Sequence, residues 1–242
     1  MKTGVFFHEI FARHSWPVVG NRFKNFPKAM ERELQLEKVD LFKPEKVSEE
    51  LLLKVHSREH LDRVKERWYY KGAAISVRGC IEASELVYDG KVENALVFNV
   101  AAGHHARHEN AWGGTYLSCT GPSIADLREK VLRNRRFLGY HNEVVRAGKK
   151  LRFAIIDTDS HHGDGTRSIF RWDKDVLHIC FCSNSKMEDE TKIDVDFLKL
   201  VELVRSCSIE ACGGRYVIII MGGSRGDIAE YIFPRMIRIL AK

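Results

Sequence analysis

The feature that most constrains the fold is an alternation of short, largely apolar segments with longer segments of helical periodicity. The apolar segments, which we predict to be strands, are Thr3–Phe7, Ala95–Val100, Arg152–Ile156, Asp175–Cys182 and Tyr216–Met221. The segments with helical spacing are Arg22–Glu37, Ser57–Tyr69, Gly72–Tyr88, Ser123–Arg133, Asp196–Cys212 and Asp227–Leu240. Such an alternation is typical of a parallel sheet covered on both faces. We therefore predict an α/β protein with three α/β/α layers and a mainly parallel sheet.

Two shorter signals mark boundaries between these elements. Ser48 stands before two glutamates, and a hydroxyl followed by early acids is typical of the start of a helix. Gly121-Pro122 indicates a turn before the helix that we predict from Ser123.

The length of the chain favours a single domain, and its apolar runs are too short to predict a membrane helix. The 242 residues suffice for one domain, 1–242, with a substantial core. The longest apolar run, Tyr216–Met221, is far shorter than the ~20 residues that a membrane helix needs. We therefore expect a soluble, cytoplasmic protein without membrane partners.

Cysteine usage and charge fit the same class of protein. The six cysteines form no CxxC pair, which favours reduced thiols over a disulfide framework or a zinc knuckle. The formal net charge of +6 is mild, and its densest part is Arg128–Arg152. A solvated basic surface is the favoured interpretation of that segment, and contact with an acidic partner or a nucleic acid is the alternative.

Polar clusters follow three of the predicted strands. They are His104-His105, Asp157–Thr166 and Gly222–Arg225. Because ligands of open α/β sheets bind beyond the carboxyl ends of the strands, we expect the three clusters to converge on one rim and form one site.

The cluster Asp157–Thr166 carries the most specific chemistry. Asp159 and His161 are two positions apart, so in an extended strand end they point the same way and could grip one cation. A carboxylate with an imidazole suits zinc or another borderline divalent metal. Gly163 and Gly165 allow a tight reversal into a helix after Thr166. The alternative is an acidic, histidine-containing loop without a metal.

Two more side chains complete the predicted site. Asp164 could hold a neighbouring imidazole in one tautomer, as acids around metal sites commonly do. The adjacent His104 and His105 suit proton transfer beside a metal, because histidine titrates near neutral pH. Taken alone, the two histidines would favour a structural or surface role.

The segment Asp157–Thr166 resembles the hallmark of the histone deacetylase family, including its acetylpolyamine-hydrolysing and prokaryotic relatives. Gly103-His104-His105 looks like the tandem histidines of that family, and His56–Leu61 looks like its early helix motif. Asp175–His178 looks like its next strand. The resemblance covers most of residues 1–195, looks closest to a divergent short prokaryotic branch, and implies an arginase/deacetylase-like fold.

The resemblance also implies roles for individual residues. Asp159 and His161 would ligate Zn²⁺, His105 would act as general base and acid, and His104 would assist electrostatically. Asp157 would orient His104.

Asp164 would orient His105 in the same way. The family also holds a monovalent cation, often K⁺, near Asp157–His161. The implied reaction is hydrolysis of an acylated lysine or an acylated small amine.

The chain departs from the family pattern at two points. The family supplies a third metal ligand, an aspartate, on a later strand, but here Lys192–Asp196 runs almost directly into a helix. One strand-helix unit is therefore predicted to be missing. The family usually places a tyrosine after a glycine run, where this chain has Ser224 or Arg225. Conceivable substitutes for the third ligand are Asp227, Glu188, Asp189 and Asp194.

Three functional hypotheses follow from these residues. The first is a metal-dependent deacylase. The second is a catalytically impaired relative that binds a metal, a ligand or a partner without turnover. The third is a ureohydrolase of the arginase type, which would need further aspartates for a two-manganese site. The sequence identifies neither the substrate nor the oligomeric state.

Overall fold

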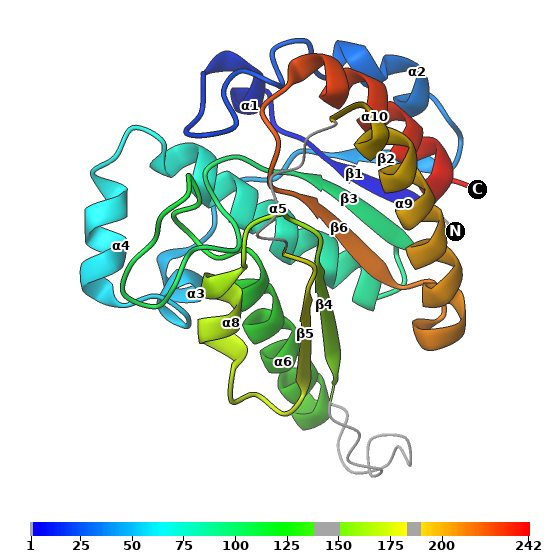
Figure 1. Cartoon of the computed structure of the whole chain (residues 1–242). Helices are drawn as coiled ribbons and strands as arrows, with labels where there is room; N and C mark the ends of the chain where they lie inside the picture. Colours follow the sequence, from blue (N-terminus) through cyan, green and yellow to red (C-terminus); the bar gives the residue numbers. More distant parts are fainter. Residues whose placement is uncertain (1, 138–150, 183–189) are drawn as a thin grey trace.

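The computed structural model describes residues 2–137, 151–182 and 190–242, and Figure 1 shows their arrangement. The elements are β1 (Thr3–Phe6), α1 (Ile10–Arg13), η1 (Lys28–Met30), α2 (Glu31–Leu34), β2 (Val39–Phe42), α3 (Glu49–Leu53), α4 (Arg58–Lys65), α5 (Tyr70–Tyr88), β3 (Asn94–Phe98), α6 (Thr120–Phe137), β4 (Phe153–Asp157), α8 (Asp164–Phe170), β5 (Val176–Cys180), α9 (Glu190–Cys212), β6 (Tyr216–Ile220) and α10 (Gly226–Leu240). Every strand pairing among them is parallel. Helices lie on both sides of the larger sheet, which confirms the predicted three-layer α/β/α fold.

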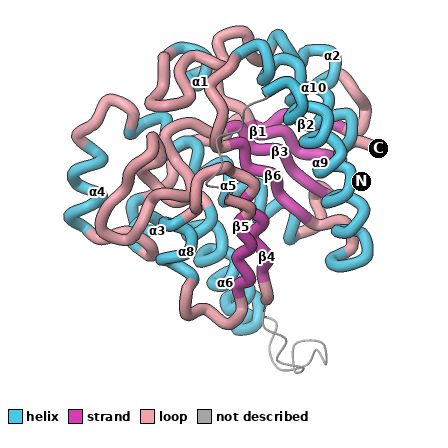
Figure 2. The backbone as a smooth tube through the Cα atoms, viewed as in Figure 1, coloured by secondary structure: helices cyan, strands magenta, loops and turns pink. Residues whose placement is uncertain are grey.

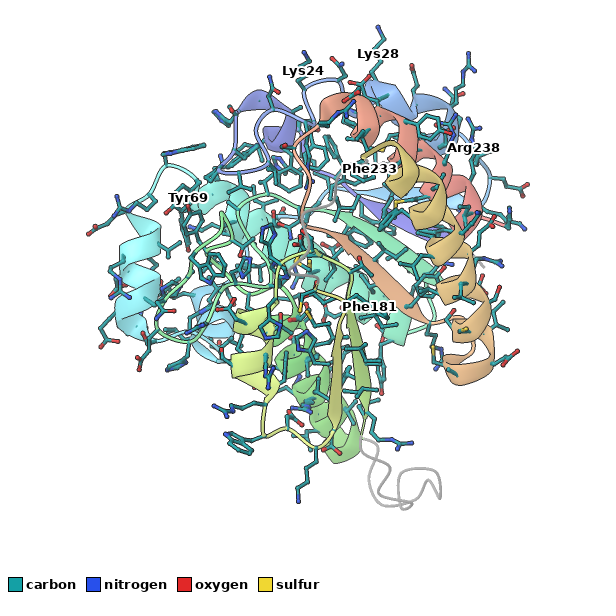
Figure 3. The ribbon with its side chains drawn as sticks, in the orientation of Figure 1. Lys24, Lys28, Tyr69, Phe181, Phe233 and Arg238 are labelled. Carbon is teal, nitrogen blue, oxygen red and sulfur yellow. The ribbon has the colours of Figure 1, made fainter. Side chains whose placement is uncertain are left out.

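The core lies around the strands β1 and β3. All residues of both strands are buried, because they are covered on both faces. On one side of this sheet Phe98 of β3 packs among Phe23, Phe26 and Phe233, with ring centroids 5.4–5.5 Å from that of Phe98. Phe233 comes from α10, which lies on that side in Figure 3. The opposite side is covered by α5, whose small residues allow close approach to the sheet.

The helix start at Ser48 and the five predicted strands are confirmed, with their ends shifted by one or two residues. Arg22–Glu37 is wrong as one helix, since only η1 and α2 form there. The edge strand β2 was not predicted, because it has four residues, Asp40 interrupts its apolar run, and it pairs on one side only. Gly121-Pro122 is not a turn before α6 but lies in its first turn, where proline loses no helical hydrogen bond.

The sheet is divided into two parts, as Figure 2 shows. Four strands follow the order β2-β1-β3-β6, and β4 and β5 form a separate pair. Among the described strands, β6 therefore pairs only with β3, and β4 only with β5. This division agrees with the prediction that one strand-helix unit is missing. Part of the basic segment Arg128–Arg152, residues 138–150, lies outside the described residues.

The β4–β5 pair is covered on one face only. Alternate residues of a strand point to opposite faces. On β5, Leu177 is 59% exposed and Ile179 is 39% exposed, and Phe181 just beyond the strand is 61% exposed. Ile156 of β4 is 45% exposed. The part of the chain that the structure describes therefore leaves one apolar face of this small sheet in contact with solvent.

None of the described helices combines the length and apolarity needed to cross a membrane.

We expect substitution of this exposed face to cost little stability. Replacing Leu177 and Phe181 with threonine keeps strand propensity and removes exposed apolar surface. The double variant should bind less of an apolar fluorescent dye, with an unchanged midpoint of thermal unfolding. As a control, Leu96→Thr in the fully buried β3 should lower the free energy of unfolding by about 2–5 kcal/mol. Equal destabilisation in both variants would mean that the face is covered in solution.

Candidate active site

The predicted site residues gather where β3, β4 and β6 end. His104 and His105 follow β3, Asp157 ends β4, and Gly222 follows β6. A Cβ atom placed on Gly222 would lie 2.4 Å from Oδ2 of Asp159, so the segments after β4 and β6 touch. The three polar clusters thus meet beyond the carboxyl ends of these strands, as the sequence predicted.

Two histidine–aspartate pairs form the centre of the site. The His104 Nδ1–H donates to Asp157 Oδ2 at 2.8 Å, and the His105 Nδ1–H donates to Asp164 Oδ1 at 2.7 Å. The centroids of the two imidazole rings are 4.1 Å apart. Each pairing binds Nδ1–H to a carboxylate and leaves Nε2 as the nitrogen available for chemistry. The structure thus brings together the four side chains that the resemblance implies for proton transfer.

The first pair is almost fully buried, and its charges stabilise each other. Burial alone would lower the pKa of His104, but the hydrogen bond and the charge of Asp157 outweigh it and raise that pKa above its ordinary value. Burial likewise opposes ionisation of Asp157, but His104 lowers the pKa of its carboxyl below the usual range. A third ring contributes, since His178 Nε2 lies 3.8 Å from Asp157 Oδ2. The pair therefore favours a protonated His104 beside an ionised Asp157.

The second pair is more open, and it includes two residues that the sequence did not predict. The Trp112 Nε1–H donates to both oxygens of Asp164 at 3.2 and 3.0 Å, and the Arg107 Nε–H donates to Oδ2 at 2.8 Å. Although burial opposes ionisation, these donors and His105 lower the pKa of Asp164 to about 2. The Trp112 ring packs against His105 with centroids 3.8 Å apart. Gly113, directly after Trp112, is the sequence feature that could have indicated this close packing. A Cβ at Gly113 would lie 2.4 Å from Cδ2 of His105.

His105 differs electrostatically from its neighbour. Burial lowers the pKa of His105, and the adjacent charge of His104 lowers it further, while Asp164 only partly compensates. A proton is therefore held more strongly by His104 than by His105. This contrast suits one histidine to accept a proton and the other to carry positive charge.

Asp159 and His161 face each other in the loop after β4. Asp159 Oδ1 lies 2.9 Å from His161 Nδ1 and also accepts a hydrogen bond from the His161 backbone N–H at 2.8 Å. We predicted this contact from an extended strand end, and that reason was wrong. The strand β4 ends at Asp157, and the contact arises from a turn in which the Asp159 side chain accepts a backbone hydrogen bond. The His161 side chain is 69% exposed and that of Asp159 is 20% exposed. An ion could therefore reach both ligand atoms from solvent.

The role expected of Gly163 and Gly165 needs correction. The helix α8 begins at Asp164, not after Thr166, and Gly163 has an ordinary φ of −71°. Glycine is needed there for close packing instead: a Cβ on Gly163 would lie 2.1 Å from Asp157 Oδ2. At Gly165 a Cβ would lie 2.5 Å from the backbone of His105. Both glycines let the loop after β4 close over the two histidine–aspartate pairs.

The described residues do not supply the third metal ligand. No His, Cys, Asp or Glu within them completes a metal-binding group with Asp159 and His161. Asp227 is exposed and forms a 2.6 Å salt bridge with Arg225, so both residues have other partners. Ser224, which with Arg225 stands where the family usually has a tyrosine, is exposed as well. Of the other substitutes considered, Glu188 and Asp189 lie outside the described residues, as does the side chain of Asp194.

A buried arginine, which the sequence did not predict, holds the loop after β6. Arg22 is 2% exposed, and its guanidinium donates to the carbonyl oxygens of Gly222 and Gly223, the latter at 2.7 Å. It also donates to Asn99 O and Met221 O, each at 3.3 Å. Burial lowers the pKa of Arg22 to about 9, which leaves it charged at neutral pH. Arg22 thereby fixes the backbone against which Asp159 lies.

A second buried side chain, His56, supports the loop that carries Arg107 and Trp112. The His56 Nδ1–H donates to Arg107 O at 2.8 Å, and the Ser118 N–H donates to His56 Nε2 at 2.9 Å. Both ring nitrogens are therefore occupied in the neutral form. A second proton would place two N–H groups against each other, and burial lowers the pKa of His56 to about 4.

We expect this neutral His56 to make stability depend on pH. Between pH 6.5 and 4 the unfolded chain binds a proton at His56 that the folded chain does not, so stability falls as the pH falls. Urea unfolding at pH 7 and pH 5 should show wild type losing roughly 2 kcal/mol more than His56→Gln. The exposed His14→Gln variant should behave as wild type. Equal pH slopes for wild type and His56→Gln would contradict a neutral His56.

Comparisons with known proteins identify relatives of this chain. The histone deacetylase domain family matches residues 17–187. A probable deacetylase of Archaeoglobus fulgidus is 30% identical over 201 residues, which are 74% of this chain and 51% of that protein. The histone deacetylase HDA1 of Saccharomyces cerevisiae is 30% identical over 54% of this chain and 19% of its own. An acetylpolyamine amidohydrolase of Burkholderia pseudomallei is 31% identical over 46% of this chain and 26% of its own length.

The fold also matches a solved structure. The crystal structure of the HDA15 HD domain superposes with a TM-score of 0.72, covering 99% of this chain and 89% of that one at 17% identity. This match confirms the deacetylase-like fold. The present chain spans about half the length of the archaeal relative and less of the other two curated relatives.

Proposed function

We propose that this chain, which belongs to the histone deacetylase family, is a metal-dependent amide hydrolase that removes acetyl or related acyl groups from lysine or small amines. The observation that carries the proposal is the pair of histidine–aspartate contacts beside Asp159 and His161 at one rim. In these two contacts Asp157 raises the pKa of His104 against the effect of burial, whereas burial lowers the pKa of His105, and this contrast suits proton transfer during hydrolysis of an amide.

The donor chemistry of Asp159 and His161 fits Zn²⁺ in part. A carboxylate and an imidazole whose ligand atoms lie 2.9 Å apart can share one borderline divalent ion. Catalytic zinc sites usually have three protein ligands, so this pair would hold the ion more weakly than a complete set. When bound, such an ion polarises an amide carbonyl and lowers the pKa of water. The possible K⁺ near Asp157–His161 and the cytoplasmic location stay predictions.

His105 is proposed as the general base and acid. Its Nδ1–H is held by Asp164, so Nε2 accepts the proton of the attacking water as the new bond to the acyl carbon forms. The same Nε2–H then donates that proton to the amine nitrogen as the carbon–nitrogen bond breaks. Trp112 and Arg107 keep Asp164 ionised, and the Trp112 ring limits the motion of His105.

His104 is proposed to stabilise negative charge on the acyl oxygen. Asp157 favours the protonated form of His104, whose positive charge lies beside His105 in a buried setting. Electrostatic stabilisation is strongest where water is excluded. This role matters more here because the expected tyrosine is absent from the loop Gly222–Arg225, whose Ser224 and Arg225 are exposed.

A second candidate is a relative that binds a metal, an acylated ligand or a partner without turnover. Two observations favour it: the described residues supply two of the usual three metal ligands, and the sheet beneath the site is divided. The two candidates differ in whether zinc-loaded protein hydrolyses an amide.

Zinc binding should depend on Asp159. We expect Asp159→Asn to weaken zinc binding at this site by more than ~10-fold, because the amide lacks the charge of a ligating carboxylate. Equilibrium dialysis with zinc quantified by mass spectrometry measures the change, with every protein carrying Cys180→Ser and Cys182→Ser so that zinc bound to these thiols does not contribute. Asp227→Asn is the matched control and should bind as wild type. Loss of zinc from Asp227→Asn with retention by Asp159→Asn would overturn the assigned ligand and implicate Asp227 instead.

Amide hydrolysis should depend on His105. With zinc present, we expect His105→Ala to hydrolyse a fluorogenic acetyl-lysine substrate ~10²-fold more slowly than wild type, because the proton-transfer group is lost. The exposed His14→Ala serves as the control and should match wild type. Equal rates for wild type and His105→Ala would refute the role. A wild type that binds zinc at Asp159 but releases no acetate from lysine or polyamine substrates would favour the second candidate.

A further inference from the structure

We infer that His162, Cys180 and Cys182 form a second metal site, which takes a soft or borderline divalent ion such as Zn²⁺. One ligand atom from each residue lies within 4.8 Å of the other two. The site lies at the end of β5, against the loop after β4, and uses none of the residues assigned above to catalysis. It is therefore independent of the proposed function.

The backbone places the two thiols on one side of the strand. Cys180 and Cys182 are two positions apart, so their side chains point the same way in an extended strand. Cys180 pairs in register with Asp157 of β4, and the Phe181 N–H donates to Asp157 O at 2.8 Å. These bonds extend the ladder to the residue before Cys182. Both thiols are half-buried, whereas the residue between them, Phe181, points to the exposed face beside β5 in Figure 3.

The third ligand approaches from the neighbouring loop. His162 Nδ1 lies 3.4 Å from Cys182 Sγ. His161 and His162 are adjacent in a non-helical segment, and they contact different partners, Asp159 and Cys182 respectively. The loop after β4 thus directs one imidazole to each site.

The distances between the three ligand atoms are close to those found in a tetrahedral zinc site. With zinc–sulfur bonds of about 2.3 Å and zinc–nitrogen bonds of about 2.0 Å, tetrahedral geometry sets ligand atoms about 3.5–3.8 Å apart. The 3.4 Å contact of Cys182 with His162 already meets this requirement. The widest separation in the group, which is within 4.8 Å, would shorten by at most about 1 Å. A side-chain rotation suffices for such a change.

The donor set identifies the class of ion. Two thiolates and one imidazole prefer Zn²⁺ to Mg²⁺ or Ca²⁺, which take oxygen ligands. Three protein ligands leave a fourth position open to water or a small ligand. Because the ligands come from β5 and from the loop that carries Asp159 and His161, a bound ion would tie that loop to β5. The ion would thereby restrain a loop that otherwise exposes most of His161.

Cobalt(II) tests the proposal without any assay of activity. Metal-free wild type titrated with Co²⁺ should develop a sulfur-to-metal charge-transfer band in the near ultraviolet, and Zn²⁺ should displace it. We expect Cys180→Ser with Cys182→Ser to abolish the band. Asp159→Asn should retain it, which separates this site from the proposed catalytic one. The paired control, Cys207→Ser with Cys212→Ser, should also retain it. A wild type without the band, or a Cys180/Cys182 variant that keeps it, would overturn the proposal.

Thiol protection provides a test on unmodified protein, in case the serine variant does not fold. Zn²⁺ should slow alkylation of Cys180 and Cys182 by at least ~10-fold, because a metal-bound thiolate is a poor nucleophile toward the reagent. Peptide mass spectrometry reads each cysteine separately. The exposed Cys207 and Cys212 serve as internal controls and should react at unchanged rates. Alkylation of Cys180 and Cys182 at rates unaffected by Zn²⁺ would refute the site.

Discussion

The buried carboxylate of Asp157 is the constraint on which the site depends. An ionised carboxylate away from water is costly unless hydrogen bonds and an opposite charge compensate it. Here His104 donates at 2.8 Å and the Asp159 N–H donates to the other oxygen at 3.2 Å. His178 adds a second ring at 3.8 Å. The loop after β4 can close over these contacts only because Gly163 has no Cβ. Burial of one charge therefore determines the course of the loop that also carries Asp159.

These contacts also join the two parts of the sheet. His104 and His105 follow β3 of the four-stranded part, whereas Asp157 and Asp164 belong to the β4–β5 part. The Thr166 N–H donates to His104 O at 3.0 Å across the same junction. In the described residues, polar contacts at the carboxyl ends thus take over what hydrogen bonds between β6 and a neighbouring strand would otherwise provide. The contacts that serve the proposed chemistry are therefore also structural, and their loss would affect both.

The sequence predicted local and periodic features well and long-range contacts poorly. The strands β1, β3 and β6 could be predicted from their short apolar runs, although only β1 and β3 are fully buried and most of β6 is half-buried. Resemblance placed the histidine–aspartate pairs, since the motif keeps their residues in order. Arg22 could not be predicted, because its partners are backbone carbonyls, which no sequence pattern marks, and most of them lie about 200 positions away in the chain. The contact of Asp159 with His161 was expected for a wrong reason, since a turn replaces the extended strand.

The two halves of the proposed chemistry depend on different parts of the fold, and this explains how one can persist without the other. The proton-transfer half rests on the segments after β3 and β4 and on α8, all of which are present and mutually bonded. The metal half needs a carboxylate from a further strand, and the described strands leave that side of β6 unpaired. Asp159 and His161 stay in contact because their turn is local and needs no neighbouring strand. A chain that loses one strand-helix unit can therefore keep two ligands and both histidine pairs in place. What the described residues lack is a third ligand, so under the proposed function affinity for the ion, rather than proton transfer, would decide whether such a site can turn over.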